Sequence, residues 1–355
     1  MSRILLLGCG HARPPLLARL SHLKRRGHDL ALLSPAGMVW PEAVPAMLSG
    51  RIASGAALLN AMDMARAADM IGIDDDVMGI DVKAGMVHRH EGDPLYFDIV
   101  SIAPPAGTRP LPGTEGHARC YDTRPLSQIL ALRTALETRF EQHPGRVIAL
   151  TIAGGGVTAI TLALAVIALA DRLGGHVGIT ILTRGRLLTG LPERAGVRVL
   201  ERLAAHGAIL QEMAPVARVD GNEAVLATGD RIAFDLFVNA TGAAGPDWLR
   251  GSGLTVDASG LLMTDNFQQV AGRPLMLAGG EAVRVADGRH PGWASLAGNI
   301  EALAQGQSPR PAPTRRPPQF IDLGGGQALA WRGRHWTLGR MALWALRWAE
   351  GRWLL

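Results

Sequence analysis

The chain has 355 residues, of which 48% are hydrophobic and 19% are charged, and this length fits two domains of ordinary size. The composition excludes a disordered chain and a collagen-like fibre. Two cysteines are too few for a disulfide scaffold and indicate a reducing, cytoplasmic compartment. The net charge of +5 lies entirely in residues 311–355, which hold seven Arg and two acids, so we expect no nucleic-acid-binding face on the rest of the chain.

Two apolar segments resemble targeting signals. The sequence Leu6-Leu7-Gly8-Cys9 looks like a lipoprotein cleavage site, but the apolar run before Cys9 is much shorter than the roughly 7–15 residues of a signal peptide. The 24 residues from 147 to 170 carry no charge, yet three consecutive glycines interrupt them. We therefore expect a strand, a tight turn and a buried helix there, and no transmembrane helix.

The first segment with a recognisable pattern opens the chain. It is expected to form a strand, a glycine turn, a helix and a second strand (residues 4–7, 8–10, to about 26, and 29–33). This is a βαβ unit of the size of a dinucleotide site, in which glycines let the backbone approach a pyrophosphate at the helix N-terminus. The motif is imperfect, because Arg13 occupies its third glycine position and Ser34 stands where a ribose-binding acid is usual.

The same pattern returns in the middle of the chain. A strand at 147–152 precedes Gly154, Gly155 and Gly156, and a long helix and a strand at 177–182 follow. Thr183 and Arg184 stand at the end of that strand, where the ribose acid is again absent. Arg184 is either a partner for the 2′-phosphate of NADPH or a solvated surface residue.

Two later segments complete the pattern. Ala240-Thr241-Gly242 closes the second unit, and a strand before Ala278-Gly279-Gly280-Glu281 leads to a helix at about 292–304. At this point the chain resembles the flavoproteins with two dinucleotide-binding domains that include type II NADH dehydrogenases and sulfide:quinone oxidoreductases. It is most similar to the bacterial branch associated with selenophosphate synthetase. The resemblance rests on GCGHA at 8–12, LLSP at 32–35, AMLSG at 46–50, TIAGGG at 151–156, LLTGLP at 187–192, NATGAA at 239–244, LAGG at 277–280 and ALAWRGR at 328–334.

The resemblance implies an α/β fold with two Rossmann-like three-layer domains, the second inserted in the first, plus a C-terminal hairpin and an amphipathic helix. The implied boundaries are 1–118 and 243–310 for an FAD-binding domain, 119–242 for an NAD(P)H-binding domain and 311–355 for a membrane or interface tail. It also implies FAD as cofactor and NAD(P)H as substrate.

The implied cofactor residues fall into two groups. Those of the FAD site are Gly8, Gly10, His11, Ser34, Pro35, Met47, Leu48, Val77, Gly279, Gly280, Glu281 and Trp293. Those of the NAD(P)H site are Gly154, Gly155, Gly156 and Val157, with Gly242 closing that unit. The helix that begins near Trp293 would direct its positive end at the flavin N1–C2=O locus.

Three departures from the family pattern stand out. Its Gly-Asp pair is Gly279-Gly280 here, with Glu281 one position later. The glutamate that commonly follows the second glycine motif appears as Thr161, and both ribose acids are missing.

Other chemistries find no residues in this sequence. Cys9 and Cys120 lie far apart with no redox motif, so we expect inert thiols and neither disulfide reduction nor sulfide oxidation. The eleven His and the acids at 74–76 show no metal-ligand spacing, and we expect no metal. What remains is electron transfer through the flavin alone, which needs no conspicuous catalytic side chain, so the catalytic residues stay unknown.

The tail has its own pattern. After a Pro/Arg linker at 309–319, residues 320–339 predict a short β-hairpin and 340–355 a helix, with five of the chain's eight Trp at 331, 336, 344, 348 and 353. On a helical wheel Arg340, Arg347 and Glu350 lie opposite Met341 and Trp348. A helix lying in the lipid headgroup plane through 336–355 is one interpretation, and a helix packed on the body or at a dimer interface is the other.

The leading hypothesis is an FAD-dependent oxidoreductase that passes electrons from NAD(P)H to a quinone-like acceptor, peripheral on the inner face of the cell membrane. One alternative is a degenerate flavoprotein that serves as a binding or scaffold subunit of a membrane complex. A second alternative is a selenium- or sulfur-linked oxidoreductase.

Overall fold

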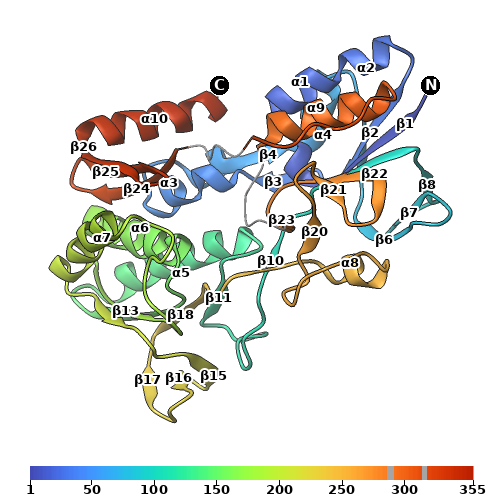
Figure 1. Ribbon diagram of the computed structural model, residues 1–355. Coiled ribbons are helices and arrows are strands. Elements are labelled where there is room, and N and C mark those ends of the chain that lie inside the picture. The colour runs from blue at the N-terminus through green and yellow to red at the C-terminus, as the bar shows by residue number, and fades with distance from the viewer. Residues whose placement is uncertain (286–291, 314–317, 355) are drawn as a thin grey trace. The chain divides into compact units, whose positions relative to one another are not determined.

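The computed structural model describes residues 1–285, 292–313 and 318–354. The chain divides into two compact units, each assembled from three stretches of sequence (Figure 1). Unit 1 contains residues 1–38, 59–107 and 243–316, and unit 2 contains residues 39–58, 108–242 and 317–355. Both units are α/β folds with a parallel sheet at their centre, as predicted.

Unit 1 is built on an eight-stranded sheet in the order β23-β20-β21-β22-β9-β1-β2-β5. Its central part is parallel, with β1 between β2 and β9 and with β22 beyond β9. The four strands nearest this centre are apolar, as expected where both faces of a sheet are covered. The strands are β1 (Arg3–Leu7), β2 (Asp29–Ser34), β5 (Ile71–Asp74), β9 (Ile99–Ile102), β20 (Leu262–Thr264), β21 (Gln269–Val270), β22 (Arg273–Ala278) and β23 (Val283–Val285).

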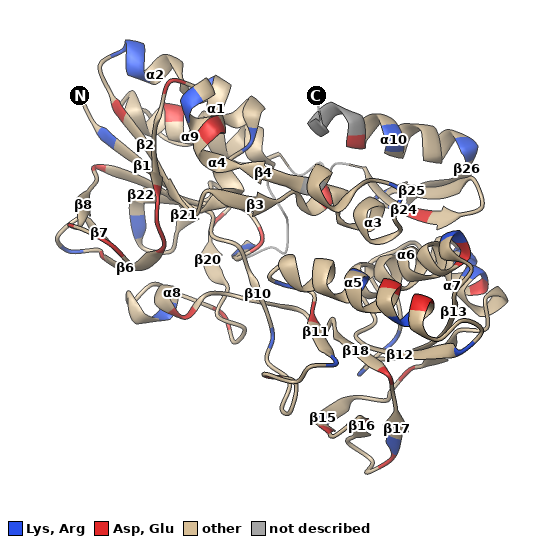
Figure 2. Cartoon of the chain, turned by 180° about the vertical axis from the view of Figure 1, so that it is seen from behind, with Lys and Arg blue, Asp and Glu red and all other residues tan. Residues whose placement is uncertain are grey.

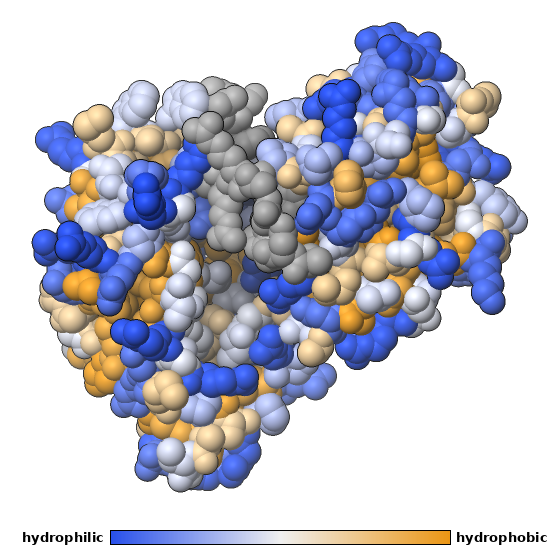
Figure 3. All heavy atoms as spheres, in the orientation of Figure 1, coloured by the Kyte–Doolittle hydropathy of each residue, from blue (hydrophilic) through white to orange (hydrophobic). Residues whose placement is uncertain are grey.

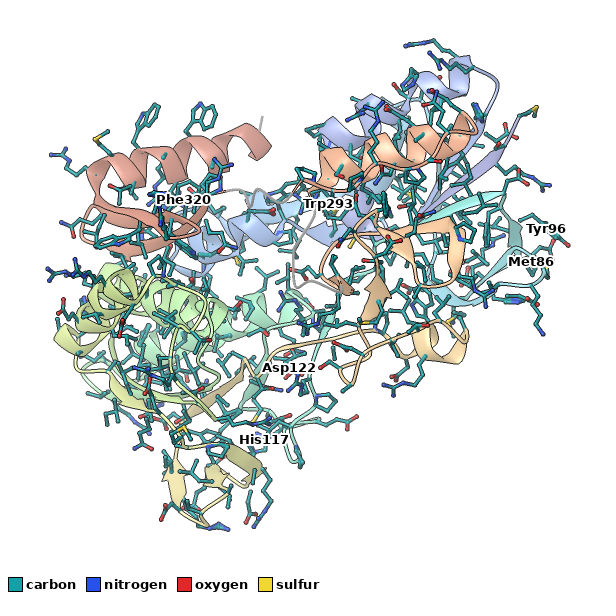
Figure 4. All side chains as sticks on the ribbon, viewed as in Figure 1. Met86, Tyr96, His117, Asp122, Trp293 and Phe320 are labelled. Carbon is teal, nitrogen blue, oxygen red and sulfur yellow. The ribbon has the colours of Figure 1, made fainter. Side chains whose placement is uncertain are left out.

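Helices cover one face of this sheet and a small antiparallel sheet lies beyond the other (Figure 1). The single helix expected to reach Arg26 is instead two short helices, which are separated at Ser21. The helices of unit 1 are η1 (Cys9–His11), α1 (Pro14–Leu20), α2 (His22–Arg25), α4 (Ala61–Ala67), α8 (Asp247–Gly251) and α9 (Trp293–Ala304), and α8 packs on β6 of the small sheet instead of on the helical face. The small sheet contains β6 (Val77–Asp81), β7 (Met86–Arg89) and β8 (Leu95–Tyr96), and Met86 and Tyr96 are labelled on it in Figure 4.

Unit 2 is built on a five-stranded parallel sheet in the order β11-β18-β12-β13-β14. Its strands are β11 (Cys120–Asp122), β12 (Val147–Ala153), β13 (His176–Leu182), β14 (Ile209–Gln211) and β18 (Leu236–Asn239). An antiparallel sheet of β15 (Val216–Asp220), β16 (Glu223–Leu226) and β17 (Arg231–Ala233) extends from it.

The helices of unit 2 include the uncharged segment of the sequence. That segment forms β12, the glycine turn and α6, which ends on Gly174 in a left-handed conformation. The helices are η2 (Pro41–Ala43), α3 (Val44–Leu48), η3 (Ser54–Ala57), α5 (Ser127–Gln142), α6 (Val157–Leu173) and α7 (Glu193–Ala205). Where the chain passes between the units it forms the short strands β3 (Gly37–Val39), β4 (Leu58–Asn60), β10 (Gly107–Thr108) and β19 (Ala243–Ala244).

The C-terminal segment packs on unit 2. It forms a three-stranded antiparallel sheet, one strand more than the predicted hairpin, followed by the predicted helix. These elements are β24 (Gln319–Gly324), β25 (Gln327–Arg332), β26 (His335–Gly339) and α10 (Arg340–Leu354), which lie beside α3 and α6 in Figure 1. None of the helices within the described ranges has the length and apolar character needed to cross a bilayer.

Candidate functional site

Both glycine turns are fixed by the same pattern of backbone hydrogen bonds to the ends of neighbouring strands. The amide of Gly8 donates to the carbonyl of Leu33 at the end of β2, and the amide of Gly154 donates to Leu182 at the end of β13, each at 2.8 Å. A Cβ atom on Gly8 would lie 2.4 Å from the carbonyl oxygen of Ala103, and one on Gly154 would lie 2.2 Å from that of Ala240. Each turn therefore needs glycine so that three strand ends meet at one edge of a sheet.

The second turn leaves its helix N-terminus open. Gly156 is the N-cap of the 17-residue helix α6, no side chain caps it, and a Cβ atom placed on it would meet no atom within 4 Å. The amides at the start of α6, from Val157 onward, therefore face an uncovered space, and the helix dipole adds positive potential there. This is the geometry that accepts a pyrophosphate.

The end of β13 lies directly against this turn. A Cβ atom on Gly155 would lie 2.5 Å from the Thr183 hydroxyl, so this threonine packs on the turn where the acid is usual. The next residue, Arg184, is exposed and has no hydrogen bond or ion pair within the described part of the chain. Its guanidinium is therefore accessible to a phosphate group, or simply hydrated.

The first turn uses its amides internally instead. The amide of Gly10 donates to Ala103 at 3.1 Å, that of His11 to Gly8 at 3.2 Å and that of Ala12 to Cys9 at 2.9 Å. The helix α1 begins with Pro14 and Pro15, which have no amide proton to donate. The two turns therefore share the same backbone hydrogen bonds to the strand ends but differ in how many backbone amides remain free to bind a ligand.

A tryptophan lies over the first turn. The indole Cη2 of Trp293, at the first position of α9, would be 3.0 Å from a Cβ atom on Gly10 and 3.0 Å from one on Gly280. The Arg13 guanidinium lies 4.8 Å from the centre of the Trp293 ring, within the range of a cation–π contact. The ring thus fills the space between the two glycine segments of unit 1, and Figure 4 labels it at the start of α9.

A buried amide without partners lies beside the same segments. Gln268 has no exposed surface, and among the residues that the structure describes neither its side-chain oxygen nor its nitrogen has a hydrogen-bond partner. Its Nε2 would be 3.8 Å from a Cβ atom on Gly279, whose own amide donates to Ile102 at 3.0 Å. A buried amide is usually satisfied, so Gln268 indicates that a polar group belongs next to Gly279. Gln268 could not be found from the sequence, since a lone glutamine belongs to no motif.

His11 is part of the core of the first turn. Its side chain is fully buried, with Nε2 2.8 Å from the Ser101 hydroxyl and Nδ1 3.3 Å from the carbonyl oxygen of Gly8. Burial lowers its pKa to about 4, so the ring is neutral at physiological pH. His11 therefore brings no positive charge to a pyrophosphate.

The end of β2 acquires a carboxylate from the next strand. Ser34 is buried, its hydroxyl donates to Pro35 at 3.0 Å, and it lies opposite Asp74 in the parallel register of β2 and β5. The Asp74 carboxylate accepts a hydrogen bond from the Ala36 amide at 2.7 Å. An acid is thus present at this edge although β2 itself does not end in one. From the sequence, the acids at 74–76 were considered only as metal ligands and not as part of this edge.

The remaining expected residues lie apart from these contacts. Met47 and Leu48 are fully buried in α3, which packs on α6 within unit 2, and Val77 begins β6 with its side chain against the core of unit 1. Gly242, with φ +133°, accepts a hydrogen bond from Arg109 at 2.9 Å at the end of unit 2. Glu281 follows the glycine pair and is close enough to Cys9 to help raise its pKa.

The two thiols are poor nucleophiles. Burial raises the pKa of Cys9 to about 11, with Glu281 adding to the effect, and burial and Asp122 raise that of Cys120 to about 12. Both cysteines are free. In the part of the chain that the structure describes, no cluster of His, Cys, Asp or Glu is arranged to hold a metal ion.

The fold and the paired glycine turns define a protein with two dinucleotide-binding units. The sequence profile of the pyridine nucleotide-disulphide oxidoreductases matches residues 3–305, and the chain belongs to this family. The recognition of this superfamily from the sequence is thereby confirmed. None of the curated proteins matches the sequence.

Solved structures show the same fold. The sulfide:quinone oxidoreductase from the hyperthermophilic bacterium Aquifex aeolicus has a TM-score of 0.82 at 14% identity, with 100% of this chain and 91% of that chain covered. The NDH2 of Plasmodium falciparum, solved in complex with NADH, has a TM-score of 0.76 at 13% identity and covers 100% of this chain and 95% of its own. The reductase in the covalent putidaredoxin reductase–putidaredoxin complex reaches 0.73 at 18% identity, over 93% and 81%.

The family uses FAD and NAD(P)H, which confirms the cofactors expected from the sequence. The second turn fits a nucleotide pyrophosphate as it stands, with Gly156 and Val157 at its open helix end. The first turn, with Gly279 and Gly280, has the Trp293 indole against it, so we expect that the indole would have to turn away for FAD to bind here and that the Gln268 amide would then gain a polar neighbour. These contacts predict that FAD binding in unit 1 depends on the position of the Trp293 side chain.

Replacing Trp293 tests this coupling. We expect Trp293→Ala to bind FAD several-fold more tightly than the unchanged apoprotein, because no indole has to leave its contacts with Gly10, Gly280 and Arg13. Trp293→Phe should lie in between, and Trp336→Ala in the C-terminal sheet controls for the loss of an indole. The measurement is quenching of flavin fluorescence on titration. A weaker affinity for FAD in Trp293→Ala would mean that the indole contacts the bound flavin instead of blocking its binding site.

The buried His11 predicts a pH dependence of stability. The pKa in the folded state, about 4, lies below the value of about 6.5 in an unfolded chain. The stability contributed by neutral His11 is therefore complete above pH 6.5 and declines as the pH falls toward 4. Between pH 7 and pH 5 we expect a loss of about 2 kcal/mol from this group. Urea unfolding at the two pH values should show a smaller loss in His11→Gln and an unchanged loss in the exposed His206→Gln.

Proposed function

We propose that this chain is an FAD-dependent oxidoreductase that passes electrons from NAD(P)H to a quinone-like acceptor at a membrane surface. Membership of a family of NAD(P)H-dependent flavin oxidoreductases supports the first half of this statement. The second half rests on the orientation of α10. The sulfide:quinone oxidoreductase and NDH2 structures, which cover the whole chain including this helix, share the fold that carries it.

The helix α10 directs apolar side chains outward. Met341, Trp344 and Trp348 are 84%, 70% and 56% exposed, at positions i, i+3 and i+7 of one face. This outer edge of α10 is pale in the space-filling view, because the hydropathy scale ranks tryptophan near the middle (Figure 3). A helix on a protein in water normally shows the opposite arrangement, with its apolar face against the core.

The charged face of the same helix is directed inward. Arg347 donates to Asp322 of β24 at 2.7 Å and to Glu350 at 3.1 Å, and Glu350 accepts from Arg51 at 2.7 Å. Arginines also lie along α10 and its sheet in Figure 2. The pattern of exposed tryptophan with flanking arginine is the one that favours insertion among lipid headgroups.

The overall reaction balances without a catalytic side chain. NAD(P)H gives up a hydride and becomes NAD(P)⁺, and a quinone takes up that hydride's two electrons and two protons, one of them from solvent, to become a quinol. Bound FAD would supply the two-electron redox chemistry that links NAD(P)H to the acceptor. The turn at Gly156 and Val157 would hold the NAD(P)H pyrophosphate, and the first turn of α9 would place positive potential where negative charge develops.

Removal of the outer apolar face tests the membrane part. We expect the triple variant Met341→Gln, Trp344→Gln, Trp348→Gln to cosediment with anionic phospholipid vesicles at least fivefold less than the unchanged protein. NADH oxidation with ferricyanide should be unaffected, while reduction of a lipid-soluble quinone in vesicles should fall by a similar factor.

A matched control removes other exposed apolar surface from the same unit. Ile209 and Met213 are 55% and 72% exposed, and the double variant Ile209→Gln, Met213→Gln should behave like the unchanged protein. Equal cosedimentation of all three proteins would exclude this face as the membrane contact. Loss of ferricyanide activity in the triple variant would mean that α10 has a structural role instead.

The thiols give a further test, because a disulfide reductase would need them. We expect Cys9→Ser and Cys120→Ser to retain NADH oxidation within about twofold, since both thiols are protonated at neutral pH. Reaction of the native protein with iodoacetamide at pH 7.5 should accordingly be slow at both positions. A loss of activity of about a hundredfold or more in either variant would instead assign that cysteine to the chemistry.

One observation favours a second candidate, a flavoprotein relative that serves as a binding subunit. The Trp293 indole fills the space beside Gly10 and Gly280 where FAD is expected in unit 1. The backbone amides of the first turn donate to backbone carbonyls and are not free for a ligand. This candidate predicts a purified protein without a flavin absorbance band near 450 nm that takes up no added FAD. A flavin band that bleaches on addition of NADH would exclude it.

A further inference from the structure

A cavity of about 390 Å³ lies within unit 2, on the inner side of α10. One wall is the face of α6 that begins at Thr161 and ends at Arg172, and the turn between β24 and β25 forms another. The segment after α3, with Arg51, and the inner face of α10, with Arg347, complete the lining. None of these residues belongs to the glycine turns, although Thr161 stands where the family commonly has a glutamate.

The lining is rich in positive charge. It contains three arginines, Arg51, Arg172 and Arg347, against the single carboxylate of Asp322. Glu350 adds a second carboxylate from behind, where it pairs with Arg51 and Arg347. The cluster of five charged groups therefore keeps one positive charge in excess.

The arginines that form ion pairs still have an unused hydrogen-bond donor. Arg51 donates from one Nη atom to Glu350, and its buried Nε has no hydrogen-bond partner in the described part of the chain. Burial lowers the pKa of Arg51, with Arg347 adding to this effect and Glu350 opposing it. A further anion beside Arg51 would satisfy the unpaired donor and offset the repulsion from Arg347.

Arg172 is the unpaired charge. It stands near the C-terminal end of α6 and has no ion pair or hydrogen bond within the described ranges. Its side chain lies against the backbone of Gly50, where a Cβ atom would be 3.2 Å from its Cδ. The absence of a side chain at Gly50 therefore leaves room for Arg172 next to Arg51.

The turn across the cavity is also free of side chains. Gly324, Gly325 and Gly326 all have left-handed φ values of +69°, +57° and +77°, and a two-glycine turn of this kind joins strands closely. Three glycines present only backbone to the cavity. They leave the three guanidinium groups as its dominant polar feature.

We propose that this cavity is a binding site for a phosphate-bearing ligand, with the phosphate held between the guanidinium groups of Arg51, Arg172 and Arg347. Guanidinium forks match the oxygens of a phosphate, and two or three of them around one anion are typical of phosphate recognition. The volume exceeds that of inorganic phosphate and accommodates a small phosphate ester. A free phosphate ester and the headgroup of an anionic lipid share this chemistry.

The test uses the full-length protein and Arg172, because its replacement breaks no ion pair. Titration calorimetry with inorganic phosphate and with glycerol 3-phosphate is compared for the unchanged protein, Arg172→Glu, Arg172→Lys and the control Arg250→Glu on the exposed surface of α8. We expect Arg172→Glu to weaken binding at least tenfold, Arg172→Lys to weaken it less, and Arg250→Glu to have no effect. Any phosphate bound at the second glycine turn is common to all four proteins and cancels in the comparison.

Vesicle binding distinguishes the two sources. Cosedimentation is measured with phosphatidylcholine vesicles with and without phosphatidic acid. Binding of the soluble esters that depends on Arg172 supports a free phosphate ester as ligand. A dependence on Arg172 found only with vesicles that contain phosphatidic acid supports a lipid headgroup. Equal behaviour of Arg172→Glu and Arg250→Glu in both measurements overturns the proposal, and the fluorescence titration with FAD is independent of either result.

Discussion

The close approach of a strand-end carbonyl to a glycine Cα is the constraint on which both dinucleotide units depend. At Gly8 and at Gly154 a side chain would stand about where the carbonyl oxygen of Ala103 or Ala240 already lies. The glycine amide then reaches the end of the second strand, and the amide of that same alanine reaches the end of the first, at 2.7 Å to Leu7 and 2.8 Å to Ala153. Because three strand ends are joined through one residue, the edge of each sheet is closed and the following turn is positioned without a side chain.

The two glycine turns have the same backbone hydrogen bonds to the strand ends, but the segments that follow them differ. In unit 2 the chain enters α6 directly after Gly156, so the helix offers its free amides at once. In unit 1 a short 3₁₀ turn uses those amides, and Pro14 and Pro15 remove two more donors from the start of α1. The polar groups left in unit 1 are set back from the turn, at Gln268 and Asp74. We therefore expect a ligand in unit 1 to depend more on the segments around Gly279 and Trp293 than on its glycine turn.

The sequence predicted the features that come from local pattern. Both βαβ units, the break in the uncharged segment and the terminal helix follow from glycine positions and hydrophobic periodicity, and all are present. Contacts between residues far apart in the sequence could not be predicted from it. The helical wheel separates Arg347 from Trp348 but does not say which face the protein covers, since that depends on Asp322 and on an arginine 299 positions before Glu350. The indole over Gly10 is likewise a contact between residues far apart in the sequence, Gly10 and Trp293, that no short motif encodes.

The orientation of α10 is the step that links charge to function. The half-turn rotation of this helix would bury Met341, Trp344 and Trp348, each a gain of about 2 kcal/mol or more for a large apolar side chain. It would also move Arg347 and Glu350 into solvent and leave the half-buried side chains of Asp322 and Arg51 without these partners, which opposes the rotation. The helix keeps its ion pairs and leaves its tryptophans outside. Such an arrangement is favourable once the outer face is covered by an apolar or interfacial medium.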